Sequence, residues 1–333
     1  MRYAVTGGSG YIGSRLIEIL GEREGTERIV NLDLRPPARP RAKESFVRAD
    51  VRDLAAIRGL LEREQPDALV HLAFVLNPMR DEARMYDIDV NGTATVLQAA
   101  AEVGVAHVLV TSSATAYGAF PDNPKPIAED WPVRGQPDFS YARDKAEADR
   151  LCQLWALQNP ERVMTILRPC IVFGPNVDNY ISRTWANSAF MPVLDGVEQE
   201  FQLVHEDDVV SAVIGLLDAK AEGAFNVAGD GTMTWKESAE MIGQKTRAIS
   251  MRAASRMSAI AWALHVPRVE APPGNLNFIR YAWLVSNEKL KTEIDWQPSA
   301  DTREVFVETM YAKGLIATPP ARAEALHSST PGA

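Results

Sequence analysis

The sequence predicts an α/β fold in which a doubly wound parallel sheet carries helices on both faces. Short β-branched and apolar runs alternate with segments of helical periodicity through the first half of the chain, and this alternation is typical of parallel sheets. The first run leads directly into the glycine-rich stretch 6–13. Because ligands of such sheets lie beyond the carboxyl ends of the strands, the residues that end each strand are the candidates for a functional site.

The expected elements follow the periodicity along the chain. The segments rich in strand-forming residues are 3–5, 28–33, 45–48, 68–72, 107–111 and 163–167. Helical patterns are found at 54–64, 93–103 and 141–157 and, where the pattern loosens, at 209–217 and 235–242.

Two structural regions and a tail are expected. Residues 1–168 should form the main domain, and residues 169–315 mainly a smaller C-terminal lobe that binds substrate, interleaved with strands that return to the sheet. From residue 316 to residue 333, alanine, proline, serine and threonine dominate without apolar periodicity. This composition predicts a disordered tail.

The composition bounds the class of protein. Hydrophobic residues make up 46% of the 333 residues, which is ample for a buried core. The formal net charge of −9 disfavours nucleic acid or an anionic membrane as a partner, since binding to phosphates needs clustered positive charge. No apolar run approaches the ~20 residues that span a bilayer, and the chain enters its first strand at once, so we expect a cytoplasmic protein without a signal peptide. Its two cysteines, Cys152 and Cys170, have no metal-ligand spacing and fit a reducing compartment.

The stretch Thr6–Gly13 has the pattern of a strand, a tight turn and the start of a helix, which is how proteins hold a dinucleotide pyrophosphate. Gly7 allows the sharp turn, Gly10 lets the backbone approach the phosphates, and Gly13 lets the helix pack close to the sheet. The phosphates would then face free N–H groups at the positive end of the helix dipole.

An acidic residue, Asp33, ends the second predicted strand about 20 residues after the glycine stretch, where the dinucleotide fingerprint expects a carboxylate. Such a carboxylate accepts a hydrogen bond from the adenosine 2′-hydroxyl and repels a 2′-phosphate. The sequence therefore predicts NAD rather than NADP as the cofactor, with Arg35 close enough in sequence to soften the preference.

A candidate catalytic group combines a strand end with a helix face. Ser113 follows the strand at 107–111, and Tyr141 and Lys145 stand four residues apart on one face of the helix expected there. A phenol has an ordinary pKa of about 10, and a neighbouring ammonium and the positive nicotinamide ring would both favour its phenolate. Tyr141 would take a proton from a substrate hydroxyl while Ser113 holds the oxygen in line and Lys145 binds the nicotinamide ribose.

Together, these residues resemble the extended short-chain dehydrogenase/reductase superfamily, in particular its NAD-dependent epimerase/dehydratase group. The likeness extends over nearly the whole chain and includes the segments 168–175, 204–209, 225–229 and 290–298. It implies a Rossmann-type sheet with a C-terminal substrate-binding lobe, and it implies that Ser113, Tyr141 and Lys145 catalyse the reaction.

The resemblance also implies a cofactor site and a dimer, and no metal site is expected. The cofactor-binding residues would be Gly7, Gly10, Tyr11, Ile12, Gly13, Asp33, Asp50, Val51, Leu72, Ala73, Phe74, Asn91, Tyr141, Lys145, Pro169, Ile171 and Val172. Members of the family commonly dimerise through the helices that correspond to 93–103 and 141–157, so a homodimer is expected.

Several residues depart from the family pattern. Phe74, Asp89 and Asp144 stand where an alanine, an asparagine and a serine or threonine are usual. Ala114 and Thr115 stand where the sugar 4,6-dehydratases of the family carry an acidic pair that protonates the leaving hydroxyl. Dehydration by that route is therefore not expected.

Two stretches of the second half bear on the substrate. The stretch 194–201 lacks the glycine-rich run and the arginine with which many nucleotide-sugar enzymes of the family bind the diphosphate, so Arg183 or Arg268 would have to substitute. The segment 251–266 predicts an amphipathic helix of the lobe, with an apolar substrate lid or a membrane contact as alternatives.

These features favour an NAD-dependent sugar epimerase, acting at C4 of a nucleotide sugar such as a UDP-sugar through a transient ketone, in the manner of a UDP-glucose 4-epimerase. The alternative is an NAD-dependent dehydrogenase or reductase of a less polar alcohol or ketone, which the missing arginine and the apolar segment 251–266 favour. A regulatory or scaffold protein that has kept only the fold is disfavoured by the intact set of Ser113, Tyr141 and Lys145.

Overall fold

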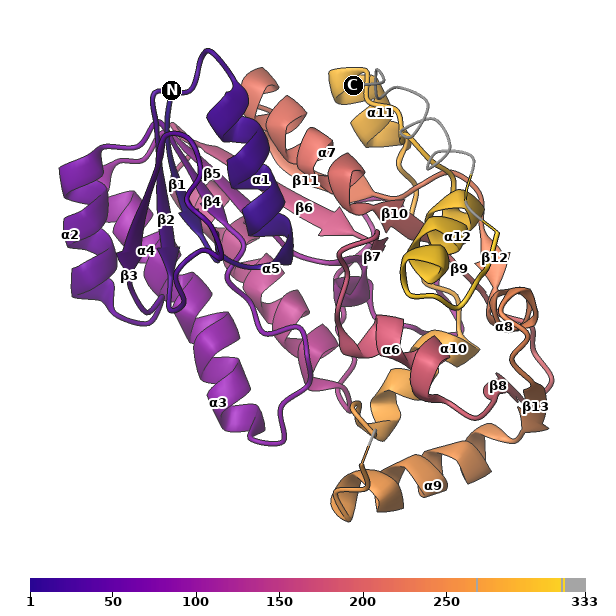
Figure 1. Cartoon of the computed structure of the whole chain (residues 1–333). Coiled ribbons are helices and arrows are strands. Elements are labelled where there is room, and N and C mark those ends of the chain that lie inside the picture. Colours follow the sequence, from indigo (N-terminus) through magenta and orange to yellow (C-terminus); the bar gives the residue numbers. More distant parts are fainter. Residues whose placement is uncertain (268, 319, 321–333) are drawn as a thin grey trace, which may run out of the picture.

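Seven parallel strands form the central sheet of the computed structural model, which describes residues 1–267, 269–318 and 320 (Figure 1). The strands are β1 (Arg2–Thr6), β2 (Arg28–Asp33), β3 (Glu44–Arg48), β4 (Ala68–His71), β5 (His107–Thr111), β6 (Val163–Pro169) and β11 (Gly223–Val227). Across the sheet they follow the order β11-β6-β5-β4-β1-β2-β3, and each neighbouring pair is parallel. The chain thus winds outward from β1 in both directions, which confirms the predicted doubly wound sheet.

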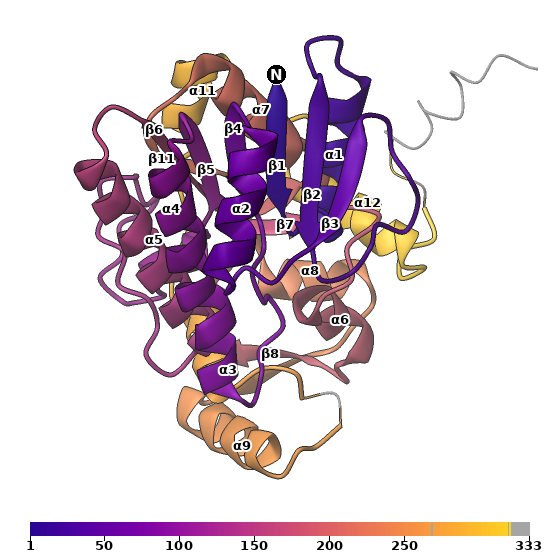
Figure 2. The ribbon, with the colours of Figure 1, turned by 90° about the vertical axis from the view of Figure 1, so that its left-hand side faces the viewer.

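Helices cover both faces of this sheet (Figure 2). On one face lie α2 (Leu54–Glu64), α4 (Gly92–Val103) and α5 (Ser140–Gln158), and on the other lie α1 (Tyr11–Glu22), α7 (Glu206–Ala219) and α11 (Glu288–Ile294). Side chains of β1 alternate between the two layers, because Tyr3 and Val5 join the core beneath α1 whereas Ala4 joins the core beneath α2. Burial on both sides explains why the strands have continuous apolar sequences.

The predicted elements are all present. The helix predicted at 54–64 has those bounds, and the others begin or end within a few residues of the predicted bounds, because element ends depend on local capping rather than on periodicity. The seventh strand, β11, corresponds to the segment 225–229 that only the family likeness had singled out.

The second half of the chain forms a lobe beyond the carboxyl ends of the strands and also returns to the sheet through α7, β11 and α11 (Figure 1). The remaining elements are α3 (Glu82–Tyr86), η1 (Asp87–Asn91), η2 (Ala114–Tyr117), β7 (Ile171–Phe173), α6 (Tyr180–Asn187), β8 (Met191–Leu194), β9 (Glu200–Phe201), β10 (Leu203–His205), β12 (Met233–Thr234), α8 (Trp235–Met241), β13 (Thr246–Ile249), α9 (Met251–Ala263), η3 (Pro273–Leu276), α10 (Asn277–Arg280) and α12 (Thr302–Ala312). The tail predicted from residue 316 onward lies mostly outside the described residues.

Aromatic packing holds the lobe together. The rings of Trp185 on α6 and Trp235 on α8 are stacked with centroids 5.3 Å apart. Phe173, Phe201 and Phe306 lie against the same Trp185 ring, with centroids 5.5 to 6.0 Å away. Strands and helices of the lobe, together with α12, are therefore fixed by contacts among large buried rings.

A buried ion pair joins the sheet to α5. The guanidinium of Arg168, near the end of β6, donates to both carboxylate oxygens of Asp149 at 2.9 and 2.8 Å, and both side chains are almost fully buried. Ser112 also donates its hydroxyl proton to Asp149 at 2.6 Å. The pair therefore fixes three segments relative to one another, namely α5, the end of β5 and the end of β6.

Asp149→Asn should destabilise the fold strongly, because it leaves the Arg168 guanidinium buried without a counter-charge. We expect the free energy of unfolding to fall by about 3 to 5 kcal/mol, as for other buried pairs that lose one partner. Urea denaturation measures this loss, and Asp122→Asn, which removes the exposed partner of Arg134, is the matched control with little expected effect. Equal effects of the two changes would contradict this role of the buried pair.

Candidate active site

The glycine loop between β1 and α1 forms a tight turn with an open side. Gly7 has a φ of +70°, and a Cβ there would lie 2.7 Å from the backbone nitrogen of Ala73. A Cβ on Gly13 would lie 2.3 Å from the Gly7 carbonyl oxygen, so Gly13 permits close packing on the loop itself rather than on the sheet. Gly10, which caps α1 without a side-chain bond, would bring its Cβ near only the Gly7 oxygen, at 3.1 Å. This open face at the helix start suits a pyrophosphate.

Asp33 ends β2 beside this loop. One of its carboxylate oxygens accepts a hydrogen bond from the backbone N–H of Ser9 at 3.1 Å, and the other accepts from the N–H of Arg35 at 3.1 Å. The carboxylate is therefore held at the loop edge where the sequence places the adenosine ribose. Further along the sheet edge, Asp50 forms an ion pair with Arg52 at 2.6 Å, and the neighbouring Val51 is buried.

Ser113, Tyr141 and Lys145 come together at the carboxyl end of β5. All three are buried, and the Ser113 hydroxyl and the Tyr141 phenol are hydrogen-bonded. Thr115 donates both its N–H and its hydroxyl proton to the Ser113 oxygen, at 3.1 and 2.9 Å. The Lys145 ammonium donates to the Thr111 carbonyl at 2.7 Å. The structure thus assembles the predicted catalytic group from β5, η2 and α5.

The electrostatics of this group differ from the sequence expectation in one respect. Burial raises the pKa of Tyr141 above its ordinary value and outweighs the hydrogen bond with Ser113, which lowers it. The Lys145 ammonium lies 6.0 Å from the centre of the Tyr141 ring. Burial in turn lowers the pKa of Lys145. The side chains alone therefore favour the neutral phenol of Tyr141. The lowering of its pKa that the sequence led us to expect from Lys145 is smaller than the rise caused by burial.

Phe74, which replaces a usual alanine, packs against both helical residues of the group. Its ring meets the Tyr141 ring edge-on with centroids 5.9 Å apart, and the Lys145 ammonium lies 3.5 Å from its centre. A cation over an aromatic face is attracted by the ring quadrupole. Phe74 therefore restricts the positions of Tyr141 and Lys145 from the side of Leu72 and Ala73, the segment expected to border the cofactor.

The π-helical turn η1 brings a carboxylate, Asp89, to this group and turns Asn91 away from it. Asp89 is buried, and one of its oxygens accepts a hydrogen bond from the Val75 N–H at 2.7 Å, while the other has no partner among the described residues. The expected cofactor ligand Asn91 is exposed and donates its amide to Asp87 at 3.0 Å. Asp89 is thus the residue of this turn that interacts with the active site.

Burial raises the pKa of Asp89 to about 8, and the nearby Lys145 charge lowers it while Asp144 raises it further. Conversely, Asp89 raises the pKa of Lys145 and of Tyr141. An asparagine, usual at this position, would contribute none of these charge effects. The sequence marked Asp89 only as a departure from the family, because its burial beside Lys145 depends on the turn geometry of η1.

The neighbouring histidine and cysteine have structural roles. His71 is buried between the hydroxyls of Thr6 and Thr93, at 2.6 and 3.0 Å, and burial lowers its pKa to about 3, so it stays neutral. Cys170 lies between the predicted cofactor contacts Pro169 and Ile171, and burial raises the pKa of its thiol. Neither side chain is therefore a base or a nucleophile.

Of three more predicted cofactor contacts, Tyr11 and Val172 lie near the junction with the lobe and Ile12 lies on α1. Tyr11, in the first turn of α1, donates its hydroxyl proton to Glu206 at the start of α7. Val172 lies on β7, which pairs with β10 of the lobe. Ile12 is half-buried and packs against the main core. The cofactor face of α1 is therefore braced by α7 as well as by the sheet.

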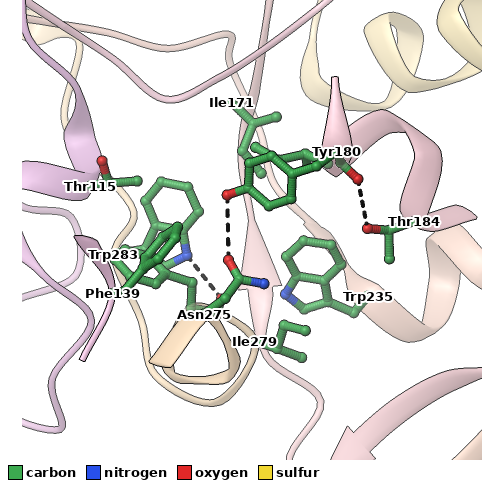
Figure 3. A pocket seen from close by; sticks show the side chains of 11 residues that line it. Thr115, Phe139, Ile171, Tyr180, Thr184, Trp235, Asn275, Ile279 and Trp283 are labelled. Carbon is green, nitrogen blue, oxygen red and sulfur yellow. Dashed lines mark hydrogen bonds between the residues drawn. The ribbon is translucent and has the colours of Figure 1, made fainter. Parts of the chain in front are cut away.

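A pocket opens next to this group, between η2 and the lobe (Figure 3). Thr115 and Ile171 line its side toward the sheet, and Tyr180 and Asn275 approach each other across it, with 3.5 Å between the Tyr180 hydroxyl and the side-chain amide oxygen of Asn275. Its other lining side chains are Phe139, Ile181, Thr184, Trp235, Phe278, Ile279 and Trp283. No sequence pattern indicated this lining, because its residues come from segments far apart in the chain.

None of the residues that line this pocket is charged. A more polar hollow adjoins it on the far side of Tyr180 and contains Arg183, one of the two arginines expected to bind a diphosphate. Arg183 donates to Glu270 at 3.0 Å and to Asp178 at 2.6 Å, so its charge is already neutralised. The other candidate, Arg268, lies outside the described residues.

Comparison with known proteins places this site in a family. The model of the NAD dependent epimerase/dehydratase family matches residues 3–228. An uncharacterized protein of Mycobacterium tuberculosis is 23% identical over 318 residues, covering 93% of this chain and 84% of its own. A UDP-glucose 4-epimerase of Lactobacillus helveticus is 32% identical over 196 residues, which is 56% of each chain.

Solved structures agree with the fold. A UDP-glucose 4-epimerase of Thermotoga maritima, crystallised with UDP-glucose, matches with a TM-score of 0.70 at 18% identity, covering 94% of this chain and 99% of its own. DesIV, a dTDP-glucose 4,6-dehydratase of Streptomyces venezuelae with NAD bound, matches with a TM-score of 0.71 at 20% identity, covering 95% and 99%.

The chain therefore belongs to the NAD dependent epimerase/dehydratase family, and NAD is its cofactor. The open face of Gly10 and the carboxylate of Asp33 fit the two ends of the adenosine diphosphate portion. Within the described residues, neither a cluster of acidic, histidine and cysteine side chains that would hold a metal nor a helix able to cross a membrane is found.

Asp33→Ser should weaken the discrimination against NADP. Two like charges about 4 Å apart near a protein surface repel by several kcal/mol, so removal of the carboxylate should tighten NADPH binding by about tenfold or more. Fluorescence titration with NADH and NADPH measures this change. Asp67→Asn, before β4 at the opposite end of the strands, removes the same charge as a control, and an unchanged NADPH affinity in Asp33→Ser would exclude this role of Asp33.

Asp89→Asn should alter how stability depends on pH. Since the folded-state pKa of Asp89 is raised from 3.8 to about 8, folding takes up a proton and stability falls as pH rises between those values. The variant lacks this loss, so its free energy of unfolding should increase relative to that of the parent between about pH 5 and about pH 8. The pKa of Asp87 is lowered instead, so Asp87→Asn should change the free energy of unfolding by a constant amount over that range. The same constant change in Asp89→Asn would refute the raised pKa of Asp89.

Proposed function

We propose that this protein is an NAD-dependent sugar epimerase that inverts C4 of a nucleotide sugar such as a UDP-sugar. The observation that carries the proposal is the buried group of Ser113, Tyr141 and Lys145 beside the pocket that Thr115 lines, with Thr115 where a dehydratase would need an acid. Such a group performs acid–base chemistry at a hydroxyl carbon.

Each side chain has a separate task in this mechanism. Tyr141 takes the proton of the substrate hydroxyl and later returns it to the ketone oxygen. Ser113, held by two donors from Thr115, keeps that oxygen in line with the phenol. The Lys145 ammonium contributes positive charge beside Phe74 and Tyr141. When bound, NAD supplies the acceptor and the donor of the hydride that leaves the carbon and returns to it.

The absence of an acid beside Ser113 disfavours dehydration. Loss of a hydroxyl as water needs a proton donor on the leaving group, and Ala114 and Thr115 offer no acidic proton. Thr115 also commits its hydroxyl proton to Ser113. The protein therefore differs from the dehydratases whose fold it shares, and the sequence likeness to the UDP-glucose 4-epimerase of Lactobacillus helveticus supports the epimerase.

A net dehydrogenase or reductase of a less polar alcohol or ketone is the second candidate. The engagement of Arg183 by Glu270 and Asp178 favours it, because a diphosphate binds best to a free guanidinium, and the lining of the pocket is uncharged. Sugars also stack on aromatic rings, so the lining itself accommodates both candidates.

We further propose a homodimer formed through α4 and α5. Leu154 and Leu157 on α5 are 50% and 80% exposed. A partner's helices would cover them, and burying such side chains stabilises association. Size-exclusion chromatography at several concentrations tests the proposal.

The two enzymatic candidates differ in what accumulates during turnover. An epimerase converts one sugar of a UDP-sugar panel to its C4 epimer without net NADH, whereas a dehydrogenase produces NADH in proportion to the alcohol consumed. Product analysis by NMR, together with absorbance of NADH, separates them. Accumulation of NADH with any alcohol, and no epimer from any UDP-sugar, would overturn the epimerase.

Tyr141→Phe should reduce kcat by about 10²- to 10⁴-fold, since it removes the acid–base group and keeps the ring. Binding of NADH, measured by fluorescence, should persist, which separates lost chemistry from lost folding. Tyr86→Phe on α3, where the side chain is exposed, is the matched change and should leave kcat unaltered. An active Tyr141→Phe would disprove the mechanism.

A further inference from the structure

The helix α9 packs only loosely on the rest of the lobe. The sequence favoured an amphipathic helix of the lobe at 251–266, and the structure has a helix there, but none of the described residues of α9 is buried. Figures 1 and 2 both place α9 at the lower edge of the molecule, away from the sheet. Its inner side touches the rest of the chain through Trp262, over whose ring the Arg80 guanidinium lies at 3.9 Å.

The outer side of α9 carries an apolar stripe. Ala253, Met257, Ile260 and Leu264 are spaced by four, three and four residues, so they project from one face of the helix. All four are exposed, with 60%, 61% and 71% of the surface of Met257, Ile260 and Leu264 accessible to solvent. Val266 extends this apolar surface beyond the helix.

Positive charge borders the stripe in a protein that is otherwise acidic. The sequence from 251 to 269 contains three arginines and no acidic residue, although the whole chain has a net charge of −9. Arg252 and Arg256 are exposed one turn apart on the flank of the stripe. The acidic residues near the ends of the helix are already paired, Asp195 with Arg280 and Glu270 with Arg183.

We propose that α9 is an interfacial helix whose stripe of Ala253, Met257, Ile260 and Leu264 enters the surface of an anionic lipid bilayer. An apolar face flanked by arginines is the pattern of helices that lie in the membrane plane, where the apolar side chains enter the acyl boundary and the cations meet lipid phosphates. At 13 residues, α9 is too short to span a bilayer, so it lies on the surface.

Charge complementarity favours lipid over a second copy of this chain. A second copy packed on the stripe would bring another helix with the same arginines against this one, with no acidic residue of α9 to oppose them. An anionic surface instead attracts every charge on the helix. The proposal departs from the sequence expectation that no membrane is a partner, which rested on the net charge of the whole chain.

The position of α9 means that its docking on a bilayer would also place the pocket near the lipid. The chain leads from α9 through Glu270 to η3, and Asn275 of η3 lines the pocket beside Tyr180. Docking of α9 would therefore hold this side of the pocket close to the bilayer. The inference does not depend on the proposed epimerase, because membrane binding is measured without turnover.

Co-sedimentation of the whole protein with vesicles tests the proposal. The protein should bind vesicles of phosphatidylglycerol and phosphatidylcholine in equal parts more tightly than vesicles of phosphatidylcholine alone, and added salt should weaken the binding. Absence of binding to both kinds of vesicle at low salt would overturn the proposal.

Variants locate the contact. The double change I260S and L264S should weaken binding to the mixed vesicles by about tenfold or more, and the double change R252E and R256E should abolish the preference for the anionic lipid. Tyr311→Ser is the matched control, because Tyr311 is exposed on α12, away from α9 and from the helices of the proposed dimer, and this change should not affect binding. NADH binding by each variant confirms that it has folded.

Two further results would contradict the proposal. Equal losses in Tyr311→Ser and in I260S with L264S would show non-specific adsorption by exposed side chains. A dimer of the parent protein that I260S with L264S converts to a monomer would instead assign the stripe to contact between copies.

Discussion

The carboxylate of Asp149 is the point on which the geometry of the active site depends. It accepts hydrogen bonds from Ser112, next to the predicted catalytic residue Ser113, and from Arg168, next to Pro169 at the expected nicotinamide side. Asp149 itself lies one turn beyond Lys145 on α5. One buried side chain therefore sets the spacing among the strand end that carries the serine, the helix that carries the tyrosine and lysine, and the strand that leads into the lobe. Catalytic groups need such placement, because small displacements cost large factors in rate.

The same burial that fixes the site also sets its charges. Tyr141, Lys145 and Asp89 share a poorly solvated space, in which burial raises the pKa of the phenol and of the carboxyl and lowers that of the ammonium. Asp89 replaces an uncharged residue of the family pattern, so the charge state of Lys145 depends on a second titrating group. The pocket beside them is uncharged, and apart from Phe139 its aromatic rings come from lobe segments that pack on one another.

Local sequence pattern predicted the sheet and the assembly of Ser113, Tyr141 and Lys145 in one place because both depend on spacing that the chain itself encodes. The glycine loop, Asp33 at a strand end, and Tyr141 four residues before Lys145 each follow from the geometry of a single turn or helix. Asp89 and Asn91 were harder to place, because a π-helical turn shifts which side chain points inward. The pocket lining and the exposure of α9 were not predictable, since both depend on how distant segments of the lobe pack. The engagement of Arg183 by Glu270, 87 residues away, is of the same kind.

The most direct test of the proposed mechanism follows the hydrogen on the reacting carbon. UDP-glucose that carries deuterium at C4 is incubated with the enzyme and NAD, and the product is examined by NMR and mass spectrometry. A closed redox cycle predicts that the C4 epimer retains the deuterium and that the solvent gains none. Loss of the label to water would indicate proton abstraction at carbon, and its accumulation in free NADH would indicate net oxidation; either result would contradict a hydride that leaves C4 and returns to it.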